Sequence, residues 1–217
     1  MGQTENAGSA GTLGQYEPGT YGQFRAWSSG EWQYDANNAE ALNAGQVVQD
    51  YFNYTITDSN GGSDHAVVRI DIVGVNDDPV GVADTGSVNE DKQLTVSAGS
   101  GVLANDTDAD AGASLQVTAV QGQSIKVGED VEGTYGTLNL DADGSYTYIA
   151  NLSAADGLAA GVSATDTFAY TVSDGTATST VNLVITVTGV GPEAVDDLAS
   201  VNENVLLDAN NASSTGC

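Results

Sequence analysis

The sequence predicts an all-β protein made of tandem antiparallel β-sandwich modules. Apolar residues recur at every second position, as in Phe168, Tyr170 and Val172, which is the period of a half-buried strand. Turn-forming residues such as Asp143-Gly144 separate the short apolar segments. The same motifs occur more than once along the chain, which indicates modules of one kind in series.

An internal repeat predicts the module boundaries. Gly19-Thr20-Tyr21-Gly22 returns as Gly133-Thr134-Tyr135-Gly136, and Ser87-Val88-Asn89-Glu90 returns as Ser200-Val201-Asn202-Glu203. In this register we expect three parts, which are the C-terminal part of a first repeat (residues 1–78), a complete repeat (residues 79–190) and the opening strands of a third repeat (residues 191–217).

We expect strands wherever apolar and polar residues alternate. In chain order these segments are 50–55, 68–72, 115–117, 167–172 and 183–187. A helix is expected only at 154–160, where Gly157 and Gly161 permit little more than a turn or two. Short strands joined by Gly, Asn and Asp turns are typical of a sandwich of this size.

The composition is strongly acidic and excludes several classes of partner. There are 30 Asp and Glu residues against four Lys and Arg residues, so the net charge is −26. The basic residues are scattered singly, so neither nucleic acid nor an anionic membrane surface is an expected partner. No apolar run approaches the roughly 18–20 residues of a membrane-spanning helix, so we expect no membrane insertion.

The residues needed for catalysis are missing from the sequence. His65 is the one histidine and Cys217 the one cysteine, so neither a Ser-His-Asp nor a Cys-His arrangement is available. No Gly-rich phosphate loop or zinc-ligand spacing occurs. We therefore expect that the protein is not an enzyme.

Several motifs together carry a family resemblance. The segment Val102-Leu103-Ala104-Asn105-Asp106-Thr107-Asp108-Ala109-Asp110, followed by Tyr135-Gly136 and by residues 167–175, resembles the VCBS repeat. This bacterial cadherin-like tandem repeat occurs in large bacterial surface adhesins. The resemblance covers essentially the whole chain and implies Ig-like or cadherin-like sandwiches in tandem, located outside the cell at the bacterial surface.

The resemblance also implies Ca²⁺ at the junctions between modules, because Val75-Asn76-Asp77-Asp78-Pro79 is similar to the calcium-binding linker of cadherins. Carried over to this chain, it assigns to the first junction Asp50, Asn76, Asp77, Asp78, Asp106, Asp108, Asp110 and Asp174. It assigns to the second junction Glu90 and Asp166, with Glu193, Asp196 and Asp197 near a linker that reads Gly191-Pro192. Independently of the resemblance, carboxylates at the alternate positions 106, 108 and 110 repel one another unless a cation lies among them.

These observations predict a calcium-stiffened structural module of a bacterial adhesin or surface fibre. One alternative is a head-to-tail filament, in which residues 191–217 of one subunit complete the truncated first repeat of an identical subunit. Another is a carbohydrate-binding adhesin domain that contacts a surface glycan, for which Trp27 is the one exposed aromatic that the strand pattern leaves unexplained. The last is an acidic, salt-adapted surface without preference for Ca²⁺.

Overall fold

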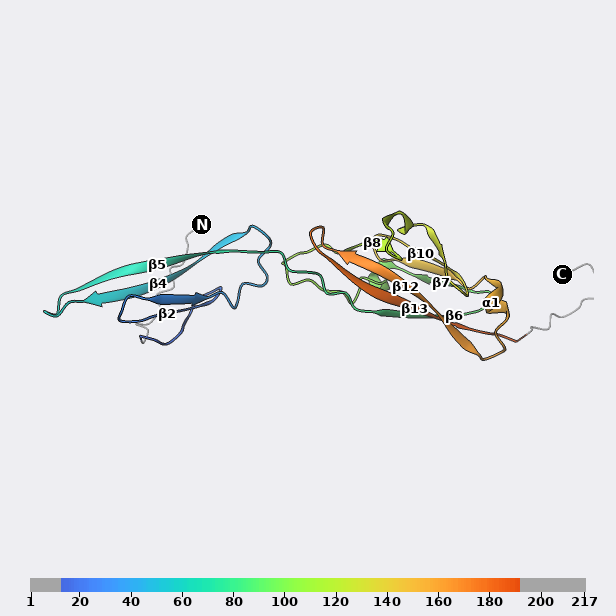
Figure 1. Ribbon diagram of the computed structural model, residues 1–217, viewed down its shortest axis with the longest axis horizontal. Helices are drawn as coiled ribbons and strands as arrows, with labels where there is room; N and C mark the ends of the chain where they lie inside the picture. The colour runs from blue at the N-terminus through green and yellow to red at the C-terminus, as the bar shows by residue number, and fades with distance from the viewer. Residues whose placement is uncertain (1–12, 192–217) are drawn as a thin grey trace, which may run out of the picture.

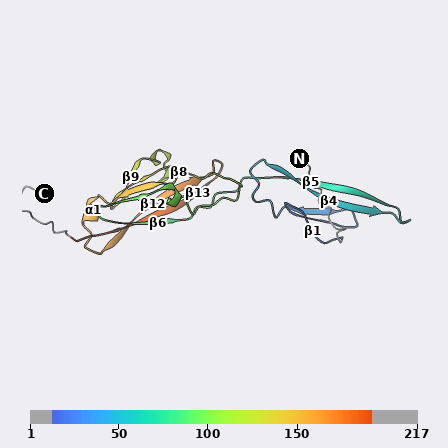
Figure 2. The ribbon, with the colours of Figure 1, turned by 180° about the vertical axis from the view of Figure 1, so that it is seen from behind.

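The computed structural model describes residues 13–191 of the chain, in which strands form two groups (Figure 1). The groups lie end to end along the long axis of the molecule, as the opposite view confirms (Figure 2). Apart from two single-turn 3₁₀ segments, the described residues contain one short helix, α1 (Ser153–Asp156). The prediction of an all-β protein is therefore confirmed, and the helix expected at 154–160 is reduced to a single turn.

The second group contains eight strands in two four-stranded sheets. One sheet has the order β7 (Gln93–Val96), β11 (Tyr146–Ile149), β10 (Thr137–Leu140) and β9 (Asp130–Glu132). The other has the order β6 (Asp84–Asn89), β13 (Thr178–Thr188), β12 (Ser163–Ser173) and β8 (Gln116–Val120). Strand β6 runs parallel to β13, whereas every other described pair in these sheets is antiparallel.

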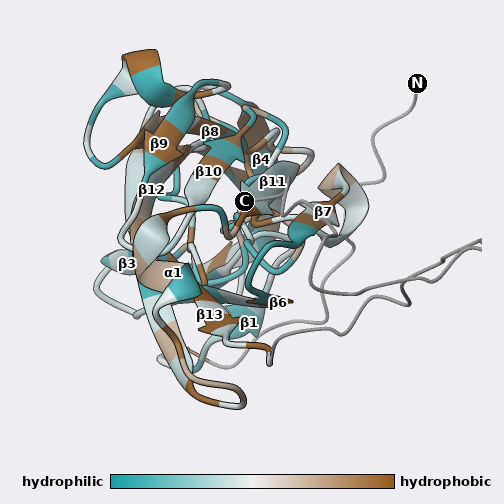
Figure 3. Ribbon diagram, turned by 90° about the vertical axis from the view of Figure 1, so that its right-hand side faces the viewer, coloured by the Kyte–Doolittle hydropathy of each residue, from teal (hydrophilic) through white to brown (hydrophobic). Residues whose placement is uncertain are grey.

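A hydrophobic core joins these two sheets. Phe168 and Tyr170 of β12 are buried with Leu138 of β10 and Tyr148 of β11 in one contiguous cluster. Burial alternates along β12 and β13, as the predicted period of two requires, and a hydrophobic band lies between hydrophilic ones on β9 in Figure 3. The group is therefore a β-sandwich.

The first group repeats part of this arrangement. It contains one sheet with the order β1 (Glu17–Pro18), β2 (Gln23–Ala26) and β3 (Trp32–Asp35), and a hairpin of β4 (Val47–Thr57) and β5 (Ser63–Val73). These pairings match those of β9–β10–β11 and β12–β13. The described residues of the first group include no strand equivalent to β6, β7 or β8.

The repeated Gly-Thr-Tyr-Gly motif has a clear structural role. Its backbone N–H groups surround the buried carboxylate of Asp166, which accepts hydrogen bonds from Thr134, Tyr135 and Gly136. The hydroxyl of Tyr148 donates to the same carboxylate at 2.6 Å. Because Asp166 lies on one sheet and Tyr148 on the other, the carboxylate links the two layers of the sandwich.

Candidate functional site

The linker after β5 is held against the acidic loop at 105–110. Val80 and Thr107 exchange two backbone hydrogen bonds of 2.7 and 3.1 Å. The N–H of Asp77 donates to Asp110 Oδ2 at 3.1 Å, and the N–H of Val82 donates to Asp106 Oδ1 at 2.7 Å. Linker and loop therefore meet along several residues, and carboxylates make part of the contact.

A second hairpin contributes Asp174 to the same junction. The side-chain amide of Asn76 donates to Asp174 Oδ2 and to the carbonyl oxygen of Asp77, both at 2.7 Å. The N–H of Ala177, the amide of Asn76 and the N–H of Thr176, in that order of effect, lower the pKa of the Asp174 carboxyl. The structure thus brings together Asn76, Asp77, Asp110 and Asp174 from three separate segments.

Three carboxylate oxygens at this junction are buried and accept no hydrogen bond, namely Asp106 Oδ2, Asp108 Oδ2 and Asp110 Oδ1. A buried anionic oxygen without a partner is costly, because it loses its hydration and gains nothing in return. The pKa of Asp106 is raised, and burial is the largest cause. The hydrogen bond from the Val82 N–H lowers this pKa, whereas the charge of Asp84 raises it further. The loop therefore concentrates negative charge that its own hydrogen bonds leave uncompensated.

The family follows from this segment and its neighbours. Residues 76–189, more than half of the chain, match the family model of the bacterial cadherin-like domain. The chain belongs to the bacterial cadherin-like domain family. The family resemblance predicted from the sequence is thereby confirmed, and the cadherin-like domain comprises the second group of strands with the linker that precedes it.

One curated relative is similar to part of the chain. The calcium-binding lectin RapA2 of Rhizobium johnstonii (strain DSM 114642 / LMG 32736 / 3841) is 39% identical over 85 residues. The match covers 37% of this chain and 36% of that protein. The chain therefore spans about a third of the length of this relative. Neither the matched family nor this lectin is described as an enzyme.

Solved structures show only distant likeness. The mouse clustered protocadherin PcdhgC3 EC1-3 is 16% identical, with a TM-score of 0.40 and coverage of 82% of this chain and 55% of that chain. The protocadherin gammaB7 EC3-6 is 13% identical, with a TM-score of 0.41 and coverage of 80% and 39%. An endo-fucoidan hydrolase of glycoside hydrolase family 107, MfFcnA4, is 18% identical with a TM-score of 0.28 and coverage of 83% and 23%. Such weak similarity carries no functional information.

The donor atoms at the cadherin-like junction fit Ca²⁺. This ion takes six to eight oxygen ligands from carboxylates, amide side chains and backbone carbonyls, and the junction offers all three kinds. Within residues 13–191, no three carboxylate, thiol or imidazole side chains are gathered closely enough to hold a metal by themselves. The fit therefore depends on the unpartnered oxygens of Asp106, Asp108 and Asp110 together with neighbouring amide and carbonyl oxygens.

Asp50 and Asp166 take a structural role in place of the predicted ligand role. Asp50 is 3% exposed and accepts hydrogen bonds from the N–H groups of Thr20 and Tyr21 and from the Tyr34 hydroxyl. Asp166, also 3% exposed, has the equivalent partners described above. These donors contact both carboxylate oxygens of each residue, so we do not include Asp50 and Asp166 in the candidate metal site.

The remaining predicted residues differ in their surroundings. Asp78 is exposed beside the buried Pro79. At the far end of the cadherin-like domain, Glu90 is 7% exposed, its Oε1 accepts the N–H of Val190 at 2.8 Å, and its Oε2 is buried without a partner. Glu193, Asp196 and Asp197 lie outside the described residues.

Sequence reasoning missed a polar pair behind the acidic loop. The Tyr170 hydroxyl donates to Asp84 Oδ2 at 2.6 Å and also lies within hydrogen-bonding distance of the carbonyl oxygens of Val82 and Val102. Burial raises the pKa of Asp84, while hydrogen bonds from Tyr170 and Asn105 oppose the shift. The repeat could have identified Asp84 from the sequence, because it places a second aspartate, Asp197, at the equivalent position.

No helix among residues 13–191 has the length and apolarity needed to cross a membrane.

Proposed function

We propose that this chain is a calcium-stiffened spacer of a bacterial surface adhesin, in which the linker and the acidic loop form the calcium junction. The observation that carries the proposal is the set of three buried, unpartnered carboxylate oxygens on residues 106, 108 and 110. Membership of the bacterial cadherin-like family and the similarity to a calcium-binding lectin support it.

Each part of the junction has a distinct task. The loop residues Asp106, Asp108 and Asp110 supply carboxylate oxygens from within the domain. Asn76, Asp77 and Asp78 supply oxygens from the linker, and Asp174 anchors Asn76 through its hydrogen bond. When bound, Ca²⁺ would neutralise these carboxylates and bridge linker to loop. Without a cation, charge repulsion in a chain of net charge −26 loosens the junction.

The setting of this spacer is part of the same proposal. A rigid acidic rod without basic patches suits the outside of a bacterial cell, where neighbouring repeats or identical subunits are its partners. The chain spans about a third of the length of the lectin that it matches. For a larger protein that contains this chain, we therefore propose adhesion and no more specific activity.

The Asp108→Asn variant tests the proposal directly. We expect the wild-type chain to bind Ca²⁺ in isothermal titration calorimetry, with a higher midpoint of thermal unfolding in Ca²⁺ than in chelator. In Asp108→Asn both effects shrink. The matched control is Asp143→Asn, which removes one charge from an exposed turn where Asn can still accept the Ser145 N–H. Wild-type stability that is equal in Ca²⁺ and in chelator would contradict the proposal.

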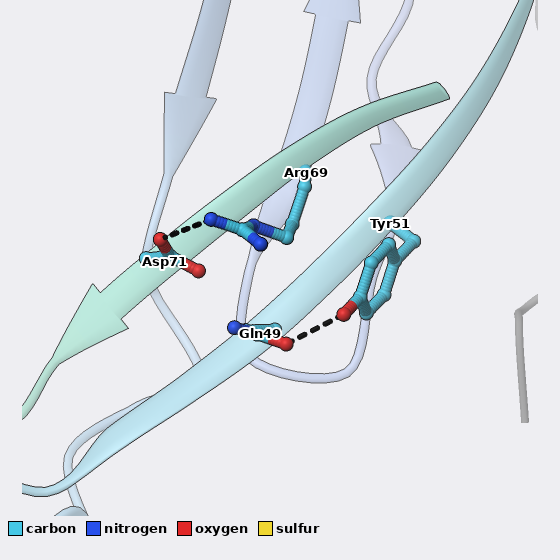
Figure 4. Close-up of polar contacts among 4 residues, drawn as sticks. All are labelled: Gln49, Tyr51, Arg69 and Asp71. Atoms are coloured by element: carbon cyan, nitrogen blue, oxygen red, sulfur yellow. Dashed lines mark hydrogen bonds and ion pairs between the residues drawn. The ribbon is translucent and has the colours of Figure 1, made fainter. Parts of the chain in front are cut away.

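A head-to-tail filament is a second candidate, favoured by an uncovered apolar face on the β4–β5 hairpin. Tyr54 and Ile56 are 43% and 61% exposed, whereas their counterparts Tyr170 and Val172 are fully buried. The opposite face of the hairpin is polar, with Gln49 and Tyr51 on β4 beside the Arg69–Asp71 ion pair on β5 (Figure 4). The exposed apolar side chains therefore lie on the face that is the core side in the complete domain.

The occupant in this candidate is the tail of another copy. Strand β6 lies parallel to β13 in the complete domain, and its Ser87–Glu90 motif returns at 200–203, which lies outside the described residues. The same pairing would place the tail along the edge of β5, which pairs with no strand other than β4 among the described residues.

Sedimentation velocity over a range of concentrations tests the filament. We expect a ladder of oligomers for the wild-type chain and loss of the ladder for Val201→Pro, because proline cannot donate to a strand pair. Ser213→Pro, outside the repeated motif, is the control. A monomer at every concentration would contradict this candidate.

A further inference from the structure

Three side chains on the outward face of the first sheet form a surface that we call the Tyr16–Arg25–Trp27 platform. The guanidinium carbon of Arg25 lies 4.5 Å from the centre of the Tyr16 ring and 4.7 Å from that of Trp27. Phe24 points the other way and stacks on Phe52, so Arg25 faces outward. Tyr16 and Trp27 are 37% and 36% exposed. Trp27, which looked isolated in the sequence, therefore has partners.

The platform is held in a fixed arrangement. Arg25 Nε and Nη2 both donate to Gln33 Oε1 on the neighbouring strand β3, at 3.1 and 2.6 Å. Within residues 13–191 the structure gives Arg25 no carboxylate partner, and the ion pair found there joins Arg69 to Asp71. The guanidinium is therefore positioned between two rings and keeps donors for another molecule.

The complete domain carries different chemistry at the same place. The repeat register puts Asp130, Asn139 and Asp141 at the three positions of the platform. There the Asn139 amide donates to Asp130 Oδ1 at 3.0 Å, and no aromatic ring is present. The equivalent sheet of the second group forms the same strand pairings with these acidic and amide side chains. Packing of the sheet therefore does not require the aromatic and basic side chains of the first group.

We propose that the platform binds a neutral pyranose chain. The part-exposed Tyr16 and Trp27 side chains can contact the apolar C–H faces of sugar rings, while Arg25, which lies over one face of each ring, donates to hydroxyl groups between them. The indole N–H of Trp27 has no acceptor among the described residues, and a Cβ at Gly14 would still lie 3.8 Å from the indole nitrogen without a clash. The net charge of −26 disfavours a polyanionic glycan. This binding role goes beyond the spacer function and involves none of the junction residues.

Binding of defined hexasaccharides tests the inference. The probes are cellohexaose, mannohexaose and maltohexaose as neutral chains and hexagalacturonic acid as the charged chain, titrated into the full chain with calorimetric and tryptophan-fluorescence readouts. We expect at least one neutral chain to bind more tightly than the charged one, equally well in Ca²⁺ and in chelator. If the platform is the binding site, Trp27→Ala and Arg25→Ala should each bind the neutral chain about tenfold more weakly than the wild-type chain.

The control is Trp32→Ala, because Trp32 is an exposed aromatic that stacks on Phe24 on the other side of the sheet, 6.0 Å between ring centres. Circular dichroism and thermal unfolding establish that each variant is folded. Failure of all three neutral chains to bind, tighter binding of hexagalacturonic acid, or unchanged binding by Trp27→Ala would each overturn the inference. Because calcium binding is measured separately, these outcomes leave the test of the spacer intact.

Discussion

Replacing Asp166 by Asn tests whether this buried carboxylate holds the fold. In the wild-type chain, Asp166 Oδ2 accepts hydrogen bonds from Tyr135 N–H, Gly136 N–H and the Tyr148 hydroxyl, and Oδ1 accepts Thr134 N–H at 2.7 Å. An amide has one acceptor oxygen, so its best orientation keeps the three bonds at Oδ2 and turns an NH₂ group toward Thr134 N–H.

The cost follows from these contacts. Thr134 is an exposed residue, so the loss of a partner for its N–H costs about 1 kcal/mol, at the low end of the range for an unsatisfied donor. Each of the three bonds that change from a charged to a neutral acceptor also loses about 1 kcal/mol. We therefore expect a loss of about 4 kcal/mol in the free energy of unfolding, measured by urea denaturation at pH 7. The loss should be the same in Ca²⁺ and in chelator, because Asp166 is not among the ligands that we propose.

The matched variant is Asp130→Asn, in which an exposed carboxylate that accepts the Asn139 amide is replaced by a group that can still accept it. Its effect should stay within about 0.5 kcal/mol. If Asp166→Asn lowers stability only in Ca²⁺, or by less than about 1 kcal/mol, the structural assignment of this carboxylate is wrong.

Three further predictions concern single side chains. Burial, followed by the Asp166 hydrogen bond and charge, raises the pKa of Tyr148 far above its ordinary value, so its stabilising contribution is complete below about pH 10 and is lost as pH rises further. In a spectrophotometric titration its phenolate should appear only on unfolding, and ionisation in the folded state near pH 10 would refute this. Asn76→Ala should raise the pKa of the Asp174 carboxyl toward its ordinary value, because the variant removes one of the hydrogen bonds that lower this pKa. NMR titration measures the shift. An unchanged pKa would show that the Asn76 amide has no such effect. Gly133→Ala should destabilise the domain by about 3 kcal/mol in urea denaturation, because a Cβ at this position would overlap the Asp166 carboxylate and the Phe168 ring. The control Gly99→Ala places its Cβ in open space and should leave stability unchanged. Equal stability of the two variants would contradict the packing argument.

The strands were predictable because burial on one face leaves a period of two in the sequence. Phe168, Tyr170 and Val172 show it in a single segment, and all three are buried in the core. The repeated Gly-Thr-Tyr-Gly motif likewise occurs at equivalent places in the structure, directly before β2 and before β10. These properties are local, or follow from comparing the chain with itself.

Contacts between distant segments were not predictable in this way. The family resemblance assigned Asp50 and Asp166 to calcium, yet they accept hydrogen bonds from a turn about 30 residues earlier in the chain. Trp27 became part of a surface only when strand pairing brought Tyr16 beside Arg25. The sequence lacked the distances that separate a structural carboxylate from a metal-binding one.

The most direct test of the proposed calcium junction is the distribution of distances between the two groups of strands. Spin labels at Asn53→Cys and Ser87→Cys, in a chain carrying Cys217→Ser, report this distribution by double electron–electron resonance. The account predicts a narrow distribution in Ca²⁺ and a broad one in chelator, with Mg²⁺ at the same ionic strength leaving it broad. A distribution of equal width in all three buffers would contradict a calcium-stiffened junction.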